Sequence, residues 1–193
     1  MTASNRYDTV AMILHWLTAA AVLGLLVAGM TMTRLQPGSA LQFSLYQLHK
    51  SVGITVLALT LIRIGWRLAH RPPVLPETMP GWERRAAAAG HLALYGLLLV
   101  LPLTGWAVVS VSPFNIPTVL YGLMPWPHLP GLATLPPADK HAAEAVLKQL
   151  HDAGAWTMLG LLAVHVGAAV RHLLWLRDGV MERMLPRWRP TPS

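Results

Sequence analysis

The chain of 193 residues contains no cysteine. Without thiol groups it forms no disulfide, and it offers no thiolate for a zinc site, an iron–sulfur cluster or a covalently attached c-type haem. Any metal or cofactor therefore depends on other side chains and on packing.

Charged residues are also scarce. They make up 12% of the chain, against 54% hydrophobic residues, and the mean hydropathy is positive. Such a composition cannot cover a soluble surface and indicates an integral membrane protein. Four apolar stretches are each about long enough to cross the ~30 Å hydrocarbon core as helices. We expect transmembrane helices at about 10–32, 48–68, 86–111 and 151–176 (apolar centre 156–175), within one domain spanning 1–193.

Acidic residues number eight and basic residues fifteen, which gives a formal net charge of +7. Nucleic acid is not the partner this pattern predicts, because the basic residues gather at alternate ends of the apolar stretches. Eleven of them lie before the first stretch, in the second connection or at the C-terminal end: Arg6, Arg63, Arg67, Arg71, Arg84, Arg85, Arg171, Arg177, Arg183, Arg187 and Arg189. The remaining connections carry only Arg34, Lys50, Lys140 and Lys148. By the positive-inside rule, both termini and the middle connection are expected in the cytoplasm.

The connections carry their own signals. Asp8 is a candidate N-cap for the first helix, and the prolines between His70 and Gly81 predict a cytoplasmic linker. The stretch 112–137, rich in proline and aromatic residues, is expected to form an external lid. Residues 138–150 are expected to extend the last helix above the membrane.

Two histidines of the last helix, His151 and His165, are fourteen residues apart. Fourteen residues bring an α-helix to within about 40° of whole turns and advance it by about 21 Å. Both imidazoles therefore face the same way at two depths, a geometry suited to two stacked haems. From the predicted topology, His49 lies at the outer level with His151, and His15 at the inner level with His165.

Other interpretations of these residues remain open. A single histidine in a membrane helix is often only a hydrogen-bonded polar residue, whereas four at compatible depths favour a functional site. A metal site without haem is disfavoured, since no carboxylate accompanies the histidines. Arg63 would face a haem propionate at the inner level, or else be a snorkelling arginine. Gly53, one turn from His49, would admit a flat porphyrin, or else serve helix packing.

An ordered set of motifs resembles the bacterial cytochrome b561 family of four-helix, di-haem b-type cytochromes, and in particular its superoxide oxidase members. The motifs are ILHW at 13–16, LHKSVG at 48–53, GHLALYGLLLVLPLTGW at 90–106 and RMLP at 183–186. The resemblance implies a four-helix membrane bundle with two haem b groups in its interior, held by His15, His49, His151 and His165. It also implies location in the bacterial inner membrane, oxidation of superoxide on the external side and reduction of ubiquinone near the cytoplasmic side.

His172 and His91 are the candidate quinone residues, because both fall near the cytoplasmic side and histidine can supply protons near neutral pH. The alternative is that they bind lipid head groups or backbone. His70, His128 and His141 are expected to be solvated. Lys50, Lys140 and Lys148 would attract an anion, although Asp139, Glu144 and Asp152 dilute that field.

Two other functional classes fit the sequence. One is an electron-transfer subunit that docks on a redox partner protein, such as a hydrogenase or another dehydrogenase. The other is a transporter that uses histidines as proton relays, which would be colourless.

Overall fold

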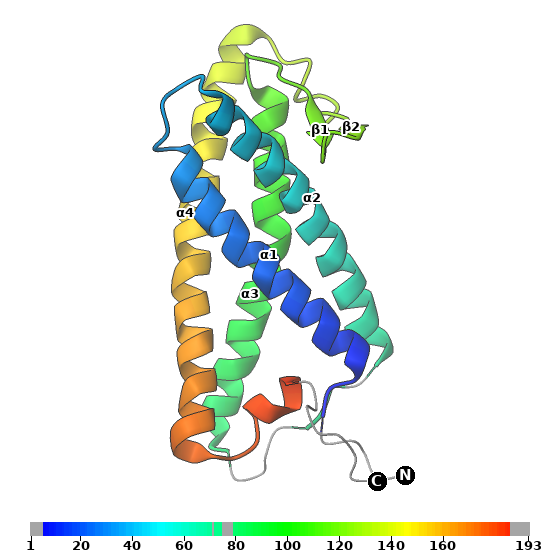
Figure 1. Ribbon diagram of the computed structural model, residues 1–193, viewed down its shortest axis with the longest axis vertical. Coiled ribbons are helices and arrows are strands. Elements are labelled where there is room, and N and C mark those ends of the chain that lie inside the picture. Colours follow the sequence, from blue (N-terminus) through cyan, green and yellow to red (C-terminus); the bar gives the residue numbers. More distant parts are fainter. Residues whose placement is uncertain (1–5, 71, 75–78, 186–193) are drawn as a thin grey trace.

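The computed structural model describes residues 6–70, 72–74 and 79–185. Four long helices form the molecule (Figure 1): α1 (Thr9–Met32), α2 (Ala40–Ala69), α3 (Gly81–Val111) and α4 (Pro137–Arg171). A short π-helical segment, η1 (His172–Leu176), continues α4, and a 3-10 turn, η2 (Met181–Met184), follows. All four helices are long and apolar enough to cross a membrane, so the predicted membrane four-helix bundle is confirmed.

Capping residues explain where the first two helices begin. The Asp8 carboxylate accepts a hydrogen bond from the Ala11 amide at 2.9 Å, as the sequence predicts, and the Ser39 hydroxyl accepts one from Gln42 at 3.3 Å. The structure corrects the start of α2, which begins at Ala40 and not near 48. Hydropathy placed that boundary too late, because Gln42, Ser44 and Gln47 interrupt the apolar residues in the first two turns of α2.

The other two helices also begin earlier than their apolar centres. α3 begins at Gly81 and not at 86, and α4 begins at Pro137, well before the membrane span expected from 151. The extra turns of α4 agree with the helical extension expected over 138–150. At the other end of α4, Arg177 adopts a left-handed conformation (φ 48°) directly after η1, and Gly179 follows with φ 75°.

The loop between α3 and α4 contains a small antiparallel hairpin that the sequence analysis did not predict. Its strands are β1 (Thr118–Leu120) and β2 (Met124–Trp126), with Val119 opposite Pro125. The turn includes Tyr121 at φ 53°, whose amide donates to the Ser51 hydroxyl at 2.9 Å and whose own hydroxyl lies 2.6 Å from that of Thr55. The hairpin therefore rests on α2 at one end of the bundle, which we call the hairpin end (Figure 1).

A layer of apolar side chains lies in the interior, one from each helix: Val22, Val56, Leu98 and Met158. Met158 is seven residues from His151 and seven from His165. Two turns of α4 thus separate this layer from each histidine. Many large apolar residues outside this layer are exposed, as expected for helices that face lipid.

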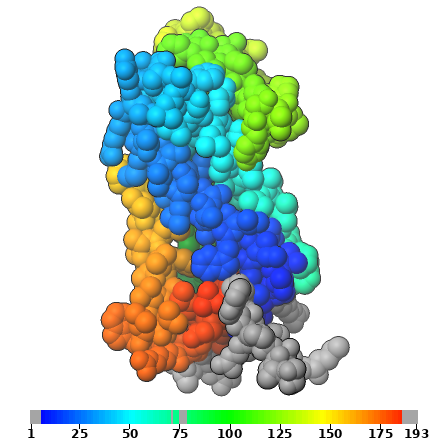
Figure 2. Space-filling model, viewed as in Figure 1, coloured from blue at the N-terminus to red at the C-terminus, as the bar shows by residue number. Residues whose placement is uncertain are grey.

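The end of the bundle where α1 begins is tied together by the C-terminal segment. The Trp16 indole donates to the Met184 carbonyl at 2.8 Å, and the Tyr7 amide donates to the Arg183 carbonyl at 3.3 Å. The Trp66 indole donates to the Asp8 carboxylate at 3.1 Å. Burial opposes ionisation of Asp8, but hydrogen bonds from Ala11 and Trp66 outweigh it and lower the pKa of this carboxyl. Between α1 and α4, Figure 2 shows a gap through which α3 is visible.

Candidate functional site: two facing pairs of imidazoles

The structure brings the four predicted histidines together as two pairs. His49 of α2 faces His151 of α4, with 6.3 Å between ring centroids and an interplanar angle of 71°. His15 of α1 faces His165 of α4, also at 6.3 Å, with an angle of 57°. We call His49 and His151 the outer pair, and His15 and His165 the inner pair.

The common distance is informative about what the pairs can hold. A bond from imidazole nitrogen to a metal is about 2.0–2.1 Å long, and the ring centre lies about 1.1 Å further on. Two imidazoles that bind one metal from opposite sides therefore have centroids about 6 Å apart. Both pairs match this spacing, so each suits one metal ion with two axial imidazoles.

Hydrogen bonding at the outer pair leaves one nitrogen of His151 available. Nδ1 of His151 lies 3.1 Å from the Thr104 hydroxyl, which itself donates to the Leu101 carbonyl at 3.0 Å. The hydroxyl proton is thus used, and Nδ1–H of His151 must be the donor, leaving Nε2 with its lone pair. Such a partner fixes the ring orientation and tautomer of a metal-ligating histidine. Nδ1 of His49 is buried and has no hydrogen-bond partner among the described residues.

Two glycines of neighbouring helices lie against the outer imidazoles. A Cβ atom on Gly105 would lie 3.1 Å from Cε1 of His151, and one on Gly29 would lie 3.4 Å from Cε1 of His49. Each ring therefore packs directly on a helix backbone. Gly53, which the sequence suggests as an opening for a porphyrin, faces open space, since a Cβ there would meet nothing within 4 Å. Gly105 and Thr104 stand in the LPLTGW motif, but only the helix packing reveals their contact with His151.

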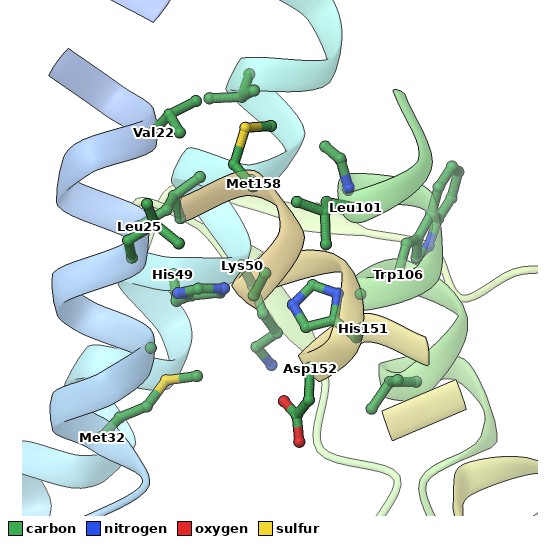
Figure 3. A pocket seen from close by; sticks show the side chains of 18 of the residues that line it. Val22, Leu25, Met32, His49, Lys50, Leu101, Trp106, His151, Asp152 and Met158 are labelled. Carbon is green, nitrogen blue, oxygen red and sulfur yellow. The ribbon is translucent and has the colours of Figure 1, made fainter. Parts of the chain in front are cut away.

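A cavity of about 430 Å³ opens at the outer pair, within the usual range for cofactor-sized ligands. Apolar side chains of all four helices line most of it, and Gly29, Gly53 and Gly105 are among the lining residues. Figure 3 shows the rings of His49 and His151 on opposite sides of this space, with Met158 and Val22 toward the bundle interior. The cavity, the paired imidazoles and the glycine walls fit a flat metalloporphyrin with two axial histidines.

The inner pair has a different partner, Arg63 of α2. Its guanidinium lies 3.0 Å from Nδ1 of His15 and 5.1 Å from the centre of the Tyr95 ring. The Arg67 guanidinium also lies over the Tyr95 ring, 6.0 Å from its centre. Among the described residues, no carboxylate pairs with either arginine. Arg63 is part-buried, and a cation beside an apolar interior is costly without an anion, which a haem propionate would supply.

The contact between Arg63 and His15 also constrains the tautomer. A guanidinium only donates, so Nδ1 of His15 is the acceptor and Nε2 carries the proton. Binding of a metal at Nε2 requires the other tautomer. A haem at the inner pair would therefore require Arg63 to release Nδ1 of His15, and the contact of Arg63 with a haem propionate stays a prediction.

The two candidate quinone residues are not neighbours in the structure. His91 of α3 lies beside His165, with 5.6 Å between ring centroids, and Nδ1 of His172 pairs with the Asp178 carboxylate at 2.7 Å. No contact between His91 and His172 is found in the described part of the chain. Burial opposes ionisation of Asp178, but hydrogen bonds from the His172 side chain and from the Val180 amide outweigh it and lower the pKa of the Asp178 carboxyl. Sequence spacing missed both contacts, since His91 and Asp178 lie on other elements.

The remaining histidines lie away from the pairs. The His70 ring stacks on the Trp66 ring, with 3.9 Å between centroids. Burial lowers the pKa of His128, and the nearby cations Lys50 and Lys140 lower it further. At the same end, Lys148 is paired with Glu144 at 3.0 Å.

A family model described as prokaryotic cytochrome b561 matches residues 6–187, nearly the whole chain. The chain belongs to the prokaryotic cytochrome b561 family. Membership makes it a multi-pass membrane b-type cytochrome with a role in electron transfer, and it implies haem b, in agreement with the fit of the paired imidazoles.

Curated relatives span the same length. The chain is 34% identical to cytochrome b561 homolog 2 of Escherichia coli K12, over 94% of this chain and 92% of the relative. It is 28% identical to cytochrome b561 homolog 1 of the same organism, over 95% and 98%. It is also 27% identical to a Yersinia pestis protein named probable superoxide oxidase CybB, over 96% and 98%.

Proposed function

We propose that this cytochrome b561 holds two haem b groups, one between His49 and His151 and one between His15 and His165. The observation that carries the proposal is the pair of facing imidazoles found twice, with the same 6.3 Å spacing. α4 supplies one ligand to each pair, and its two histidines are about 21 Å apart along the helix.

A haem b held by the imidazoles of each pair would supply one-electron chemistry through the porphyrin edge. The chain's own contribution is placement. Met158 and Val56 fill the layer between the two levels and exclude water from it, while Thr104 and Gly105 hold the His151 ring. The helices thereby keep an outer and an inner reaction site apart.

We further propose that the electron donor is superoxide on the external side and that the acceptor is ubiquinone on the cytoplasmic side. Two superoxide ions are each oxidised to dioxygen, and their two electrons with two protons convert ubiquinone to ubiquinol. The name of the Yersinia pestis relative supports the donor. Two cations, Arg34 and Lys50, and one anion, Asp152, line the outer cavity, and this excess of positive charge supports an anionic donor independently.

His91 and His172 are proposed to serve the quinone. His91 stands beside the inner pair, and His172 is held by Asp178 at the same end of the bundle. A quinone needs hydrogen bonds to its carbonyl groups and protons on reduction, and imidazole can provide both. Substitution of either residue by alanine is expected to slow quinone reduction while leaving both haem spectra intact. Loss of a haem would instead make that residue a ligand.

The proposed location is the bacterial inner membrane, with both termini in the cytoplasm. The distribution of arginines supports this orientation. It puts the hairpin, the outer pair and the cavity on the periplasmic side.

The experiment that tests the haem assignment is a haem count on purified protein. Wild type is expected to give two equivalents of haem b by pyridine haemochrome assay, and the alanine variants of His15, His49, His151 and His165 about one each. Colourless protein, as the transporter interpretation requires, would contradict the proposal.

The donor and acceptor are tested by titration of the oxidised protein with superoxide, with and without ubiquinone. Haem reduction followed by reoxidation with ubiquinone is the expected result. A stable partner protein on purification, together with no reduction by superoxide, would support the alternative of a subunit that serves a hydrogenase or another dehydrogenase.

A further inference from the structure

Where the outer cavity meets the hairpin, it is lined by a hydrogen-bond donor that has no acceptor among the described residues. Trp126 of β2 lines the cavity, and its indole nitrogen is buried with no hydrogen-bond acceptor among the described residues. The ring is held against Trp106, with 5.6 Å between centroids. A buried N–H group without an acceptor is destabilising, so an acceptor that enters the cavity and accepts this hydrogen bond would be favoured.

The same cavity is lined by a cation, Lys50, that follows His49 directly in the chain. Its side chain is half-buried, and its ammonium group reaches the Pro117 carbonyl of the lid loop at 3.4 Å. No carboxylate of the described chain lies within ion-pair distance of it. In Figure 3 the ammonium end of Lys50 is drawn beyond the level of the His49 and His151 rings, on the side away from Met158, and the Asp152 carboxylate is drawn further out on that side.

Two donors from different elements, one charged and one neutral, therefore line one cavity beside the outer imidazoles. Neither the Lys50 ammonium group nor the Trp126 indole has a charged acceptor among the described residues. The apolar lining of the cavity makes charge–dipole and charge–charge interactions stronger than in water.

We propose that Lys50 and Trp126 form a subsite for an anionic oxygen at the lid end of the outer cavity. The inference deepens the proposed function and rests on it. The oxygen belongs either to an incoming superoxide ion or to a carboxylate of a porphyrin seated between His49 and His151. Both sources offer the same chemistry, an oxygen that carries negative charge and accepts an N–H bond.

The test uses the full chain with its haems in detergent and four variants. Lys50→Gln removes the charge and Lys50→Arg restores it. Trp126→Phe keeps an aromatic ring against Trp106 and removes the N–H group. Lys148→Gln is the matched control, because it changes the net charge equally at the same end, where Lys148 is already paired with Glu144. The readouts are haem reduction rates with superoxide and with a neutral hydroquinone, their salt dependence, and equilibrium haem potentials.

For superoxide as the source, Lys50→Gln is expected to lower the superoxide rate about tenfold and to flatten its salt dependence. Trp126→Phe should lower the same rate several-fold, and Lys50→Arg should retain it. The rate of haem reduction by the neutral hydroquinone should not change in any of these variants. For a porphyrin carboxylate as the source, Lys50→Gln and Trp126→Phe should shift the potential of one haem to more negative values. Haem reduction by superoxide and by the neutral hydroquinone should then both be slower.

Rates, salt dependence and potentials of Lys50→Gln and Trp126→Phe that match those of Lys148→Gln would overturn the subsite. Failure of the proposed function looks different. Wild type would then be reduced by the hydroquinone and not by superoxide, and the potentials alone would decide whether Lys50 and Trp126 hold a porphyrin carboxylate.

Discussion

At the scale of single residues, the outer site depends on atoms that touch the imidazoles. The Thr104 hydroxyl accepts a hydrogen bond from Nδ1–H of His151, which leaves Nε2 of that ring available to bind a metal. Gly105 has no side chain, so the ring can lie on the backbone of α3. Gly29 does the same for His49 on α1, with slightly more room. The two glycines therefore differ in how much crowding a methyl group would cause.

This difference predicts a graded response to Gly→Ala. Gly105→Ala puts a methyl group 3.1 Å from Cε1 of His151, so the ring must shift, and the outer haem should bind weakly or be lost. Gly29→Ala, at 3.4 Å from His49, should change the spectrum with little loss of haem. Haem content and optical spectra measure both effects.

Gly96→Ala in α3 is the control for this series, because a Cβ there meets nothing within 4 Å. Equal haem content in Gly105→Ala and Gly96→Ala would refute the close packing of the imidazole on α3.

At the scale of elements, α4 organises the molecule. It carries one histidine of each pair and, midway between them, Met158, which is 2% exposed. Met158 packs with Val22, Val56 and Leu98, so the layer between the two levels receives one side chain from every helix. The elements outside the membrane stretches close the ends, with the hairpin on α2 and the C-terminal turn on α1.

Met158→Ala is expected to destabilise the bundle by about 2–5 kcal/mol, because the cavity it leaves lies between four helices. Both haems should still bind, since the ligands are two turns away. Thermal unfolding monitored by circular dichroism measures the change. Leu92→Ala, at a side chain 75% exposed, is the control and should have little effect. Similar unfolding temperatures for the two variants would show that the layer does not stabilise the bundle.

At the scale of the whole molecule, the two ends differ in charge. Arginines gather where α1 begins and α2 ends, whereas the hairpin end carries few basic residues, one of them paired with Glu144. The proposed orientation follows from this asymmetry. The chain has no cysteine, so single cysteines can report it without background.

Thr134→Cys, in the lid loop, is expected to react with a membrane-impermeant maleimide on intact spheroplasts. Ala69→Cys, the last residue of α2, should react only after the membrane is permeabilised. The reverse pattern would invert the proposed topology. Haem content of both variants checks that the bundle has formed.

Several features could be predicted from the sequence alone. Hydropathy located four spanning helices, Asp8 marked the start of α1, and spacing put His151 and His165 on one face of α4. These features are local, because a helix turns by a fixed angle per residue and needs a fixed length to cross the hydrocarbon core. The topology predicted from the arginines indicated which histidines share a level, and the structure has His49 facing His151 and His15 facing His165.

Contacts between helices were decided only by the tertiary structure. It set His91 beside His165 and not beside His172, turned Arg63 onto His15, and brought Gly105 against His151. In a membrane helix, the surfaces facing lipid and facing the bundle are both apolar, so the pattern does not reveal which face turns inward. Helix packing chooses that face, and with it the neighbours of each imidazole.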